Sequence, residues 1–341
     1  MPSGFNAFPI FLPQRLQFTM NKRLRNFLLI WGAAAATAGV WALGKYQLWT
    51  APVGQAENWC IEIEPGMNAA DALEASHPEV ASVIDWRGWS IYPGKYCAVG
   101  IQQANEVARR IATGQREEIR LPLPSKRTLA EIAGHLAPRI WADSAAIMEA
   151  LDTDSMLWQI IPNTYRVYWE CDANQLADRL RSESRNWWTA DRLKQAWSLG
   201  LTQREVVTLA SIVQEETATV EEAPRVAGLY LNRLKKKMLL QADPTLKFAL
   251  GDWTIRRLLD EDKKIASPYN TYRNPGLPPG PIRIPEPTYL EAVLQAEQHN
   301  YLYMCAKPDG SGTHAFARNY AQHLRNAREY QTMLNRQRIY R

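Results

Sequence analysis

Two adjacent glutamates, Glu215 and Glu216, are the residues whose type and setting best suit acid–base chemistry. They close the run ASIVQEE, which follows a threonine and a glutamate spaced as a helix start. Thr202 with Glu205 three residues later is a capping-box pattern, in which each side chain bonds the other residue's backbone N–H. The spacing therefore predicts a helix that begins near Thr202 and carries both glutamates at its far end.

Helix periodicity separates the two glutamates. On a 3.6-residue repeat, Leu209, Val213 and Glu216 lie close to one stripe, whereas Glu215 points about 100° away. A carboxyl group held among apolar neighbours has its charged form disfavoured, so its pKa rises toward the range that a general acid needs near neutral pH. The alternative is a solvated helix end, because paired glutamates are usually exposed.

Familiar catalytic and metal-binding motifs do not occur in the sequence. It has no HExxH, GxSxG, Walker or GxGxxG sequence and no CxxC pair, so no metal and no cofactor is expected. An ordinary glycosidase needs a second carboxylate, about 5 Å or about 6.5–9.5 Å from the first. Asp243 is the nearest suspect, but its position before Pro244 is already explained if it caps a helix.

Length and composition favour a globular protein of about two domains. The chain has 341 residues, of which 46% are hydrophobic and 22% charged, enough for two cores. The net charge of +5 is spread along the chain, so no nucleic-acid partner is expected. Thirteen Trp and fourteen Tyr slightly favour contact with carbohydrate, although most such rings fill cores.

The N-terminal region predicts a membrane anchor. Residues 27–44 contain no charge, which is just long enough for a single transmembrane helix. Basic residues precede this run and no acidic residue occurs before Glu57, so residues 1–26 are expected in the cytoplasm and the rest outside. A cleaved signal peptide is the competing interpretation, and Met20 is an alternative start.

The next region, 45–120, is predicted to be a small α+β module. The expected order is strand, helix, helix, strand, helix and strand. The strands are placed at 59–65, 94–99 and 117–123, the first helix at 68–77 and the last at 104–114. It is either a spacer or a binding module. Its two cysteines, Cys60 and Cys97, are the first candidates for a disulfide; four buried free thiols are the alternative, and Cys171 with Cys305 would be the remaining pair.

The larger part of the chain, 121–341, is predicted to be one domain, with a boundary near residue 120. Residues 121–200 are expected to be helical and residues 201–330 to form the catalytic core. Near the end of the core, a strand at 301–306 and a hairpin turn at 308–316 are predicted. Within that core, the segment from Ser267 to Pro287 spends seven prolines and two glycines in twenty-one residues. So much proline favours a rigid, extended loop that suits the wall of a site.

Several short motifs resemble one family. In order they are LASIVQEET, LNRL, LQADPT, YNTY, GLPPGPI and the closing YLYM, THAF and AQH elements. Together they resemble the membrane-anchored endolytic murein transglycosylases, the YceG-like (MltG) family, closely over 201–330 and loosely over 45–120. The resemblance implies an α+β fold: a single N-terminal transmembrane helix, a small LysM-like module and a larger YceG-like catalytic domain.

The resemblance also implies an activity. Glu216 would be the catalytic acid of a lytic transglycosylase, which cuts between N-acetylmuramic acid and N-acetylglucosamine without water. The sugar's own 6-hydroxyl attacks and leaves a 1,6-anhydro end, so Glu216 would act alone. The residues expected around the sugar are polar: Ser211, Gln241, Asp243, Asn270, Thr271 and Tyr272. Asn163 stands where relatives usually have Asp, and Gln214 where they often carry an acid.

The leading hypothesis is therefore an enzyme of the bacterial inner membrane with its catalytic domain in the periplasm. It would cut nascent peptidoglycan strands and so end their elongation, with the strands and the membrane as partners and peptidoglycan synthases as further candidates. Two alternatives stay open. One is a non-catalytic peptidoglycan-binding scaffold of the synthesis machinery, and the other is a hydrolytic muramidase.

Overall fold

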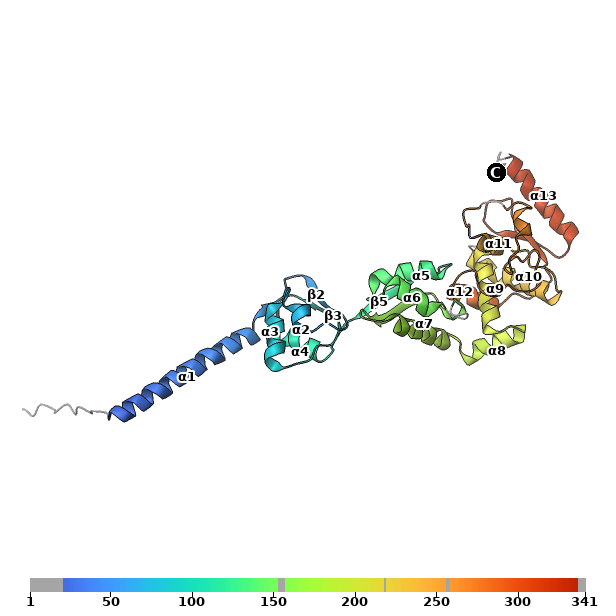
Figure 1. The fold of residues 1–341 in the computed structure, drawn as a ribbon. Coiled ribbons are helices and arrows are strands. Elements are labelled where there is room, and N and C mark those ends of the chain that lie inside the picture. The colour runs from blue at the N-terminus through green and yellow to red at the C-terminus, as the bar shows by residue number, and fades with distance from the viewer. Residues whose placement is uncertain (1–20, 153–156, 218, 256–257, 337–341) are drawn as a thin grey trace, which may run out of the picture. The chain divides into compact units, whose positions relative to one another are not determined.

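The computed structural model describes residues 21–152, 157–217, 219–255 and 258–336, and its contacts divide the chain into two compact units. Unit 1 comprises residues up to Cys60, Met67–Tyr92 and Cys97–Gln115. Unit 2 comprises Ile61–Gly66, Pro93–Tyr96 and the chain from Arg116 onward. Helices and strands are mixed, with an apolar helix at the N-terminus (Figure 1), which confirms the predicted fold class.

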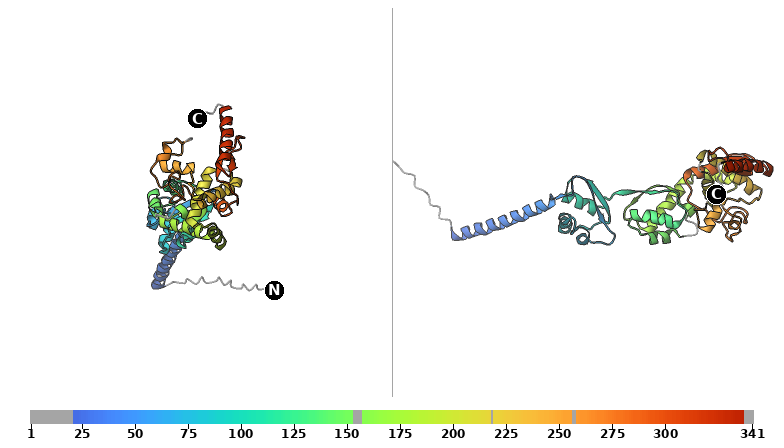
Figure 2. Two further views of the ribbon diagram at one scale, coloured as in Figure 1. Left: turned by 90° about the vertical axis from the view of Figure 1, so that its right-hand side faces the viewer. Right: turned by 90° about the horizontal axis from the view of Figure 1, so that it is seen from above.

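The N-terminal helix α1 (Lys22–Trp49) is continuous over 28 residues in every view (Figures 1 and 2). Asn21 caps it by accepting a hydrogen bond from the backbone N–H of Arg23. The helix buries none of its residues, and it is long and apolar enough to cross a membrane. It contains the predicted 27–44 span and is a candidate membrane anchor. The predictions for residues 1–20, Met20 among them, lie outside the described residues.

The small module follows the predicted order of strand, two helices and strand. Its elements are β1 (Pro52–Val53), β2 (Asn58–Ile63), α2 (Ala69–Leu73), α3 (Pro78–Arg87), β3 (Gly94–Val99), β4 (Gln102–Gln103) and α4 (Ala104–Ala112). β1 pairs antiparallel with β4, and β2 pairs with β3. Side chains of β2 alternate between buried and exposed, so Trp59 and Ile61 point inward while Cys60 lies on the other face.

Cys60 forms a disulfide with Cys97, which confirms the pairing proposed from the sequence. The bond joins the neighbouring strands β2 and β3 through two residues that both belong to unit 1. The other two cysteines, Cys171 and Cys305, are free thiols, so the second pair does not form.

Unit 2 begins with a two-stranded sheet covered by helices. β5 (Glu118–Leu123) pairs antiparallel with β6 (Asn163–Tyr168), from Glu118 opposite Tyr168 to Leu123 opposite Asn163. The sheet shares a core with α5 (Leu129–Leu136), α6 (Ser144–Leu151) and α7 (Ala173–Trp187). Short 3-10 helices lie at Ala137–Arg139 and Leu157–Gln159.

Two details of this layer differ from the prediction. The strand at 117–123, expected to complete the small module, pairs instead with β6 in unit 2. β6 itself lies in a region expected to be helical. The six-residue run NTYRVY contains β-branched and aromatic residues, which suit a strand. Its partner strand is far away in the sequence: Tyr165 lies opposite Leu121, 44 positions earlier.

The rest of unit 2 is built around α9 (Gln203–Glu216). Its other elements are α8 (Ala190–Leu199), η3 (Val220–Glu222), α10 (Ala223–Lys235), α11 (Asp243–Leu250), η4 (Asp262–Lys264), α12 (Pro287–Leu294), β7 (Tyr303–Ala306), β8 (His314–Ala317) and α13 (Tyr320–Arg336). β7 and β8 form an antiparallel hairpin, as predicted.

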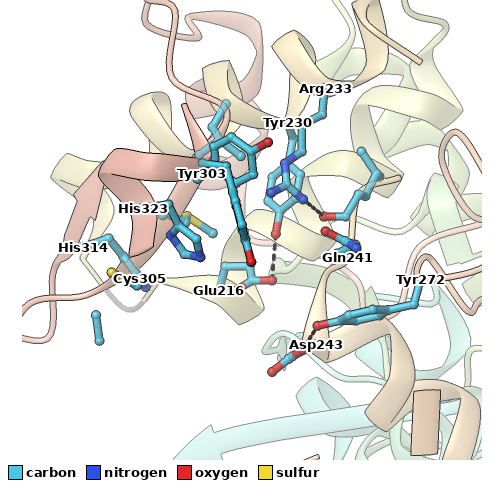
Figure 3. A pocket seen from close by; sticks show the side chains of 15 residues that line it. Glu216, Tyr230, Arg233, Gln241, Asp243, Tyr272, Tyr303, Cys305, His314 and His323 are labelled. Carbon is cyan, nitrogen blue, oxygen red and sulfur yellow. Dashed lines mark hydrogen bonds between the residues drawn. The ribbon is translucent and has the colours of Figure 1, made fainter. Parts of the chain in front are cut away.

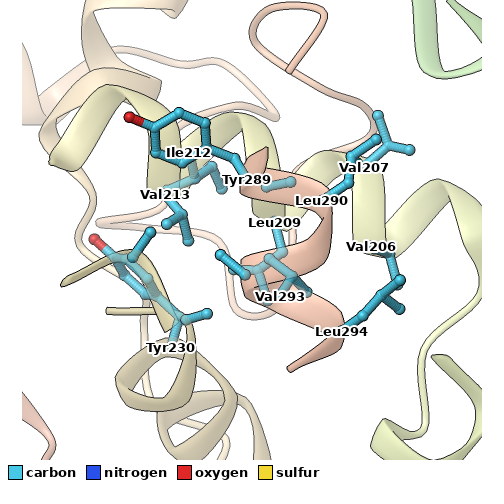
Figure 4. Packing of buried hydrophobic residues seen from close by; sticks show 14 of the residues in the cluster. Val206, Val207, Leu209, Ile212, Val213, Tyr230, Tyr289, Leu290, Val293 and Leu294 are labelled. Atoms are coloured by element: carbon cyan, nitrogen blue, oxygen red, sulfur yellow. The ribbon is translucent and has the colours of Figure 1, made fainter. Parts of the chain in front are cut away.

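α9 is the central helix of this core. The sequence predicted one apolar face, but all eight residues from Val206 to Val213 are buried. The reason is that α12, α10, α11 and α8 all contact this helix. Figure 4 shows Leu209 and Val213 against Val293 of α12, with Tyr230 of α10 nearby. A helix enclosed on all sides holds its last turn, and therefore both glutamates, in a fixed position.

The proline-rich loop runs along α9 and is bonded to it. The Ser211 hydroxyl donates to the Thr208 carbonyl oxygen (2.7 Å) and accepts from the backbone N–H of Ile282 (3.0 Å). Nearer the end of the helix, the Gln214 side chain accepts from the N–H of Glu286 (2.8 Å). These hydrogen bonds tie the loop to the last two turns of the helix that carries Glu216.

Candidate active site

Glu216 is the last residue of α9 and lines a cavity of about 340 Å³ (Figure 3). The predicted capping box of Thr202 and Glu205 is present at the other end of the helix. The polar or titratable residues that line the cavity come from several elements: Glu216, Tyr230, Arg233, Gln241, Asp243, Tyr272, Tyr303, Cys305, His314 and His323.

Tyr230 and Glu216 form the hydrogen bond at the centre of the site. The Tyr230 hydroxyl, from the middle of α10, donates to a Glu216 carboxylate oxygen at 2.7 Å. Burial, and then the adjacent Glu216, raise the pKa of Tyr230 well above its usual value. The phenol therefore keeps its proton and remains a donor.

The carboxyl of Glu216 titrates near neutral pH. Burial raises the pKa of Glu216 to about 7; the Tyr230 hydrogen bond and the cations of Arg233 and Lys247 oppose this shift, and Asp243 adds to it. Both the protonated and the ionised form are then populated at pH 7, which is the property required of one group that first gives and then takes a proton. The direction agrees with the prediction from helix periodicity.

Glu215, next in sequence, has a different environment. Its carboxylate accepts from the Arg127 guanidinium at 3.0 and 3.2 Å and forms an ion pair with Arg283 of the proline-rich loop. The Glu215 side chain is 11% exposed. A carboxylate held in ion pairs with two guanidinium groups serves structure. A solvated helix end therefore describes neither glutamate.

Asp243 lies in the same cavity, on the wall formed by the start of α11. The cap position belongs to Ala242, which has no side-chain capping bond, and Asp243 and Pro244 occupy the first two helical positions. The predicted cap is therefore wrong. Instead, the Asp243 carboxylate accepts a hydrogen bond from the Tyr272 hydroxyl of the YNTY segment.

Gln241 completes this wall. Its backbone has φ of +51°, a left-handed conformation that is uncommon outside glycine. The Gln241 N–H donates to the Thr271 carbonyl oxygen at 3.1 Å, which holds the turn against the YNTY segment. The predicted residues Gln241, Asp243 and Tyr272 are thus brought together beside Glu216.

Asn270 and Thr271 lie behind the wall. The Asn270 amide donates to the carbonyl oxygens of Lys263 and Ile265, both at 2.9 Å, and its oxygen accepts from the N–H of Tyr272 at 3.0 Å. The Thr271 hydroxyl accepts from the N–H of Ala242 at 3.0 Å. Both residues are at most 1% exposed.

Ser211 is also fully buried, with its hydroxyl used between α9 and the loop. The sequence predicted that Ser211, Asn270 and Thr271 contact the sugar. The structure does not fit this role, because the polar groups of these side chains form hydrogen bonds within the protein. Their side chains fix the loop that carries Tyr272.

The opposite wall comes from the C-terminal hairpin and α13, and sequence reasoning assigned none of its residues a role. The Nδ1 atom of the His314 ring lies 2.7 Å from the Glu222 carboxylate, and the backbone N–H of His314 donates to the same carboxylate at 2.8 Å. His323 stacks on Tyr303, with ring centres 5.4 Å apart. Figure 3 shows this group across Glu216 from Tyr272 and Asp243. The YLYM, THAF and AQH motifs were its only sequence signal.

Arg233 of α10 supplies a buried cation beside the carboxyls. It is 8% exposed, and its guanidinium donates to the carbonyl oxygens of Leu302 (2.7 Å) and Leu240 (2.6 Å). It therefore joins the two walls of the cavity to α10. Among the described residues, no group of three or more His, Cys, Asp and Glu side chains is arranged to hold a metal.

The profile of the YceG-like family matches residues 62–329, which is most of the chain. This protein belongs to the YceG-like family. The match includes every residue of the cavity described above. It begins within β2 and ends within α13.

Curated YceG-like relatives match shorter parts. The endolytic murein transglycosylase of Bacillus subtilis strain 168 is 43% identical over 106 residues, 31% of this chain and 29% of that protein. The protein of the same name from Streptococcus pneumoniae D39 is 35% identical over 137 residues, 39% of this chain and 25% of its own length. The alignments thus span less than a third of the relatives.

A solved structure supports the fold. The crystal structure of a YceG-like protein from Listeria monocytogenes aligns with 80% of this chain and 99% of its own, with a TM-score of 0.51 and 23% sequence identity. At that identity the likeness concerns the fold.

Asn163, predicted to stand where YceG-like relatives usually have Asp, is not among the residues that line the cavity. Asn163 begins β6, where its amide donates to Glu183 at 2.9 Å and its oxygen accepts from the N–H of Thr164 at 2.8 Å. An Asp could keep the second bond but would place a carboxylate against Glu183. Asn therefore suits its neighbour here, and the substitution leaves the lining around Glu216 unchanged.

Proposed function

We propose that this protein is a membrane-anchored endolytic lytic transglycosylase of peptidoglycan. It would cleave the bond between N-acetylmuramic acid and N-acetylglucosamine inside nascent strands, leave 1,6-anhydro ends and so terminate elongation. The observation that carries the proposal is the position of Glu216 in the cavity. Burial raises its pKa to about 7, and its carboxylate accepts a hydrogen bond from the Tyr230 hydroxyl. Two relatives carry the name of this activity.

The reaction needs one residue that exchanges a proton twice. Protonated Glu216 gives its proton to the glycosidic oxygen as the bond from that oxygen to the anomeric carbon breaks. The resulting carboxylate then takes the proton of the muramic acid 6-hydroxyl while that oxygen bonds to the anomeric carbon. Glu216 ends as it began, and no water is consumed. Arg233 and Tyr230 favour the ionised intermediate state of the carboxyl.

The walls would hold the strand on both sides of this group. Gln241, Asp243 and Tyr272 present polar groups on one side, and Tyr303 and His323 present stacked rings on the other. Aromatic rings and planar polar groups suit the alternating apolar faces and hydroxyls of a sugar chain.

Glu216→Gln tests the assignment, because it keeps the shape of the side chain but cannot transfer a proton. We expect loss of anhydro-ended products with retained binding of isolated glycan strands. Glu221→Gln is the matched control, since Glu221 is an exposed glutamate a few residues away. Equal activity of wild type and Glu216→Gln would refute the assignment. A wild-type protein that binds strands but releases no product would support the scaffold alternative.

A hydrolytic muramidase is the second candidate, and the position of Asp243 favours it. Since Asp243 lines the cavity instead of capping a helix, a second carboxylate is available near Glu216. Such an enzyme would add water and leave reducing ends. Mass spectrometry separates the two activities, because transglycosylation products are lighter by one water.

The anchor and the small module complete the proposal. We infer that α1 crosses the inner membrane with its N-terminus in the cytoplasm, and that the part of unit 1 after α1 and all of unit 2 lie in the periplasm. The basic residues that precede the apolar run support this orientation. The strand–helix–helix–strand order of β2, α2, α3 and β3 supports a LysM-like module. Peptidoglycan synthases are candidate partners. Protease digestion of unit 2 in spheroplasts but not in intact cells would support this orientation.

A further inference from the structure

Three tryptophans of unit 1 gather where α1 leaves its apolar run. Trp49 is the last residue of α1, and Trp86 and Trp89 lie at and just beyond the C-terminal end of α3. The ring of Trp49 meets that of Trp86 edge-on, with centres 5.8 Å apart, and its centre is 6.3 Å from that of Trp89. The chain thus brings together rings from positions about 40 residues apart.

Two cations lie over these rings. The Arg87 guanidinium is within 5.3–6.0 Å of all three ring centres, and the Lys45 ammonium is 4.8 Å from that of Trp86. Within the described part of the chain, neither cation forms an ion pair with a carboxylate. The nearest acid on the same helix is Asp85, which is exposed. Arg87 is exposed as well, so its charge is open to an anion.

The core of unit 1 does not account for this cluster. α3 buries Val80, Ala81, Val83 and Ile84 on its inner face, whereas Trp86 and Trp89 are only half-buried. Large rings held at a partly exposed surface beside unpaired cations resemble the aromatic and basic belt found where membrane proteins meet lipid headgroups.

The length of the apolar run of α1 places these three tryptophans at the depth of the lipid headgroups. The apolar run 27–44 is about 27 Å long at 1.5 Å per residue, close to the thickness of a hydrocarbon core of roughly 30 Å. Lys45 follows the run directly, and Trp49 lies about 7 Å further along the axis. The headgroup layer occupies roughly 5–8 Å on each side of the core. α3 contacts α1, so its end is held at the same level.

We propose that the headgroup cluster, made of Lys45, Trp49, Trp86, Arg87 and Trp89, binds the lipid headgroup layer and takes anionic phospholipid in preference to zwitterionic lipid. The proposal rests on α1 being the membrane anchor and is independent of the chemistry at Glu216. The rings occupy the interface, and the two cations pair with lipid phosphates. Unit 1 is then seated on the membrane through two helices rather than tethered by one.

Fluorescence quenching by lipids brominated near the headgroup tests the first part. The full chain is reconstituted into vesicles with Trp31→Phe and Trp41→Phe as background, because those rings lie inside α1 and would be quenched by depth alone. Trp86→Phe with Trp89→Phe should lose the larger part of the headgroup-depth quenching. Trp197→Phe is the control, since that ring is 84% exposed and belongs to α8 of unit 2. Unchanged quenching in the double variant would overturn the proposal.

Vesicle composition tests the second part. Quenching is compared between pure phosphatidylcholine and phosphatidylcholine mixed with phosphatidylglycerol. We expect stronger quenching in the anionic vesicles, and we expect Lys45→Gln with Arg87→Gln to abolish that difference. Lys194→Gln with Lys236→Gln removes two exposed cations of unit 2 and should preserve it. Equal quenching of the unsubstituted protein in both lipids would overturn the anionic preference. Neither readout depends on catalysis.

Discussion

At the scale of single residues, Glu215 and Glu216 are sequence neighbours with opposite surroundings. Glu215 forms ion pairs with two guanidinium groups, whereas burial raises the pKa of Glu216 to about 7. The contrast matters because only a group that exchanges its proton near neutral pH can serve as both acid and base. The ion pairs of Glu215 with Arg127 and Arg283 give that side chain a structural place, and Glu216 is the member of the pair that lines the cavity.

Tyr230→Phe should shift the pH dependence of cleavage. The Tyr230 hydroxyl favours the ionised form of Glu216 and so lowers its pKa, against the larger effect of burial. Without that donor the pKa rises further, by about one unit if the bond contributes about 1.5 kcal/mol. The limb of the kcat/KM profile on which activity falls with loss of the Glu216 proton should therefore move to higher pH. An unshifted profile would separate Tyr230 from the titration of Glu216.

The negative charge that Glu216 acquires at high pH should also lower the stability of the folded protein. Its folded-state pKa of about 7 lies above the ordinary value of 4.5, so its stabilising contribution is complete below pH 4.5 and is lost as pH rises through 7. Glu216→Gln removes the buried charge and should raise the free energy of unfolding at pH 8 by on the order of 2 kcal/mol. The difference should vanish at pH 4. Urea unfolding of both proteins at the two pH values measures it.

At the scale of elements, α9 and the proline-rich loop act as one support for the site. Ser211→Ala leaves the N–H of Ile282 without its partner in a buried place, which should cost about 1–3 kcal/mol. The loop carries the Tyr272 wall, so kcat/KM should fall as well. Ser198→Ala, an exposed serine of α8, should change neither quantity. Thermal melts and strand-cleavage rates on the same preparations decide the matter.

The sequence predicted those elements whose signals are local. The Thr202–Glu205 capping box, the stripe that carries Glu216 and the β7–β8 hairpin depend on neighbours within a few positions, and all three are present. The Asp243 cap failed although its signal is local, because the side chain finds the Tyr272 hydroxyl 29 residues away.

Longer separations were out of reach. The Arg127–Glu215 ion pair joins residues 88 positions apart, and β6 exists because β5 pairs with it. The same limit explains why Ser211, Asn270 and Thr271 were placed around the sugar. Their types suit a glycan, but their burial is set by tertiary contacts that a single sequence does not display.

At the scale of the whole molecule, the two units have separate sources of stability. Unit 1 is small, and the Cys60–Cys97 disulfide joins two of its residues that are 37 positions apart in the sequence. Unit 2 has two hydrophobic cores and, among its described residues, no disulfide. A bond of this kind also fits the oxidising periplasm proposed for both units.

Cys60→Ala with Cys97→Ala should therefore destabilise unit 1 alone. The expected loss is about 3–4 kcal/mol, from the greater freedom of its unfolded chain. Limited proteolysis with mass mapping should show cleavage within residues 67–92 or 97–115, whereas unit 2 should resist as in the wild type. Cys171→Ala is the control, because that thiol is free. Equal sensitivity of both units to the double substitution would contradict their independence.

The central claim is that Glu216 alone moves the proton and that water takes no part. The most direct test digests purified glycan strands in water enriched in heavy oxygen and identifies the ends by mass spectrometry, with wild type and Glu216→Gln side by side. The account predicts 1,6-anhydro ends without heavy oxygen from the wild type and no new ends from the variant. Reducing ends that carry heavy oxygen, or anhydro ends formed by Glu216→Gln, would contradict it.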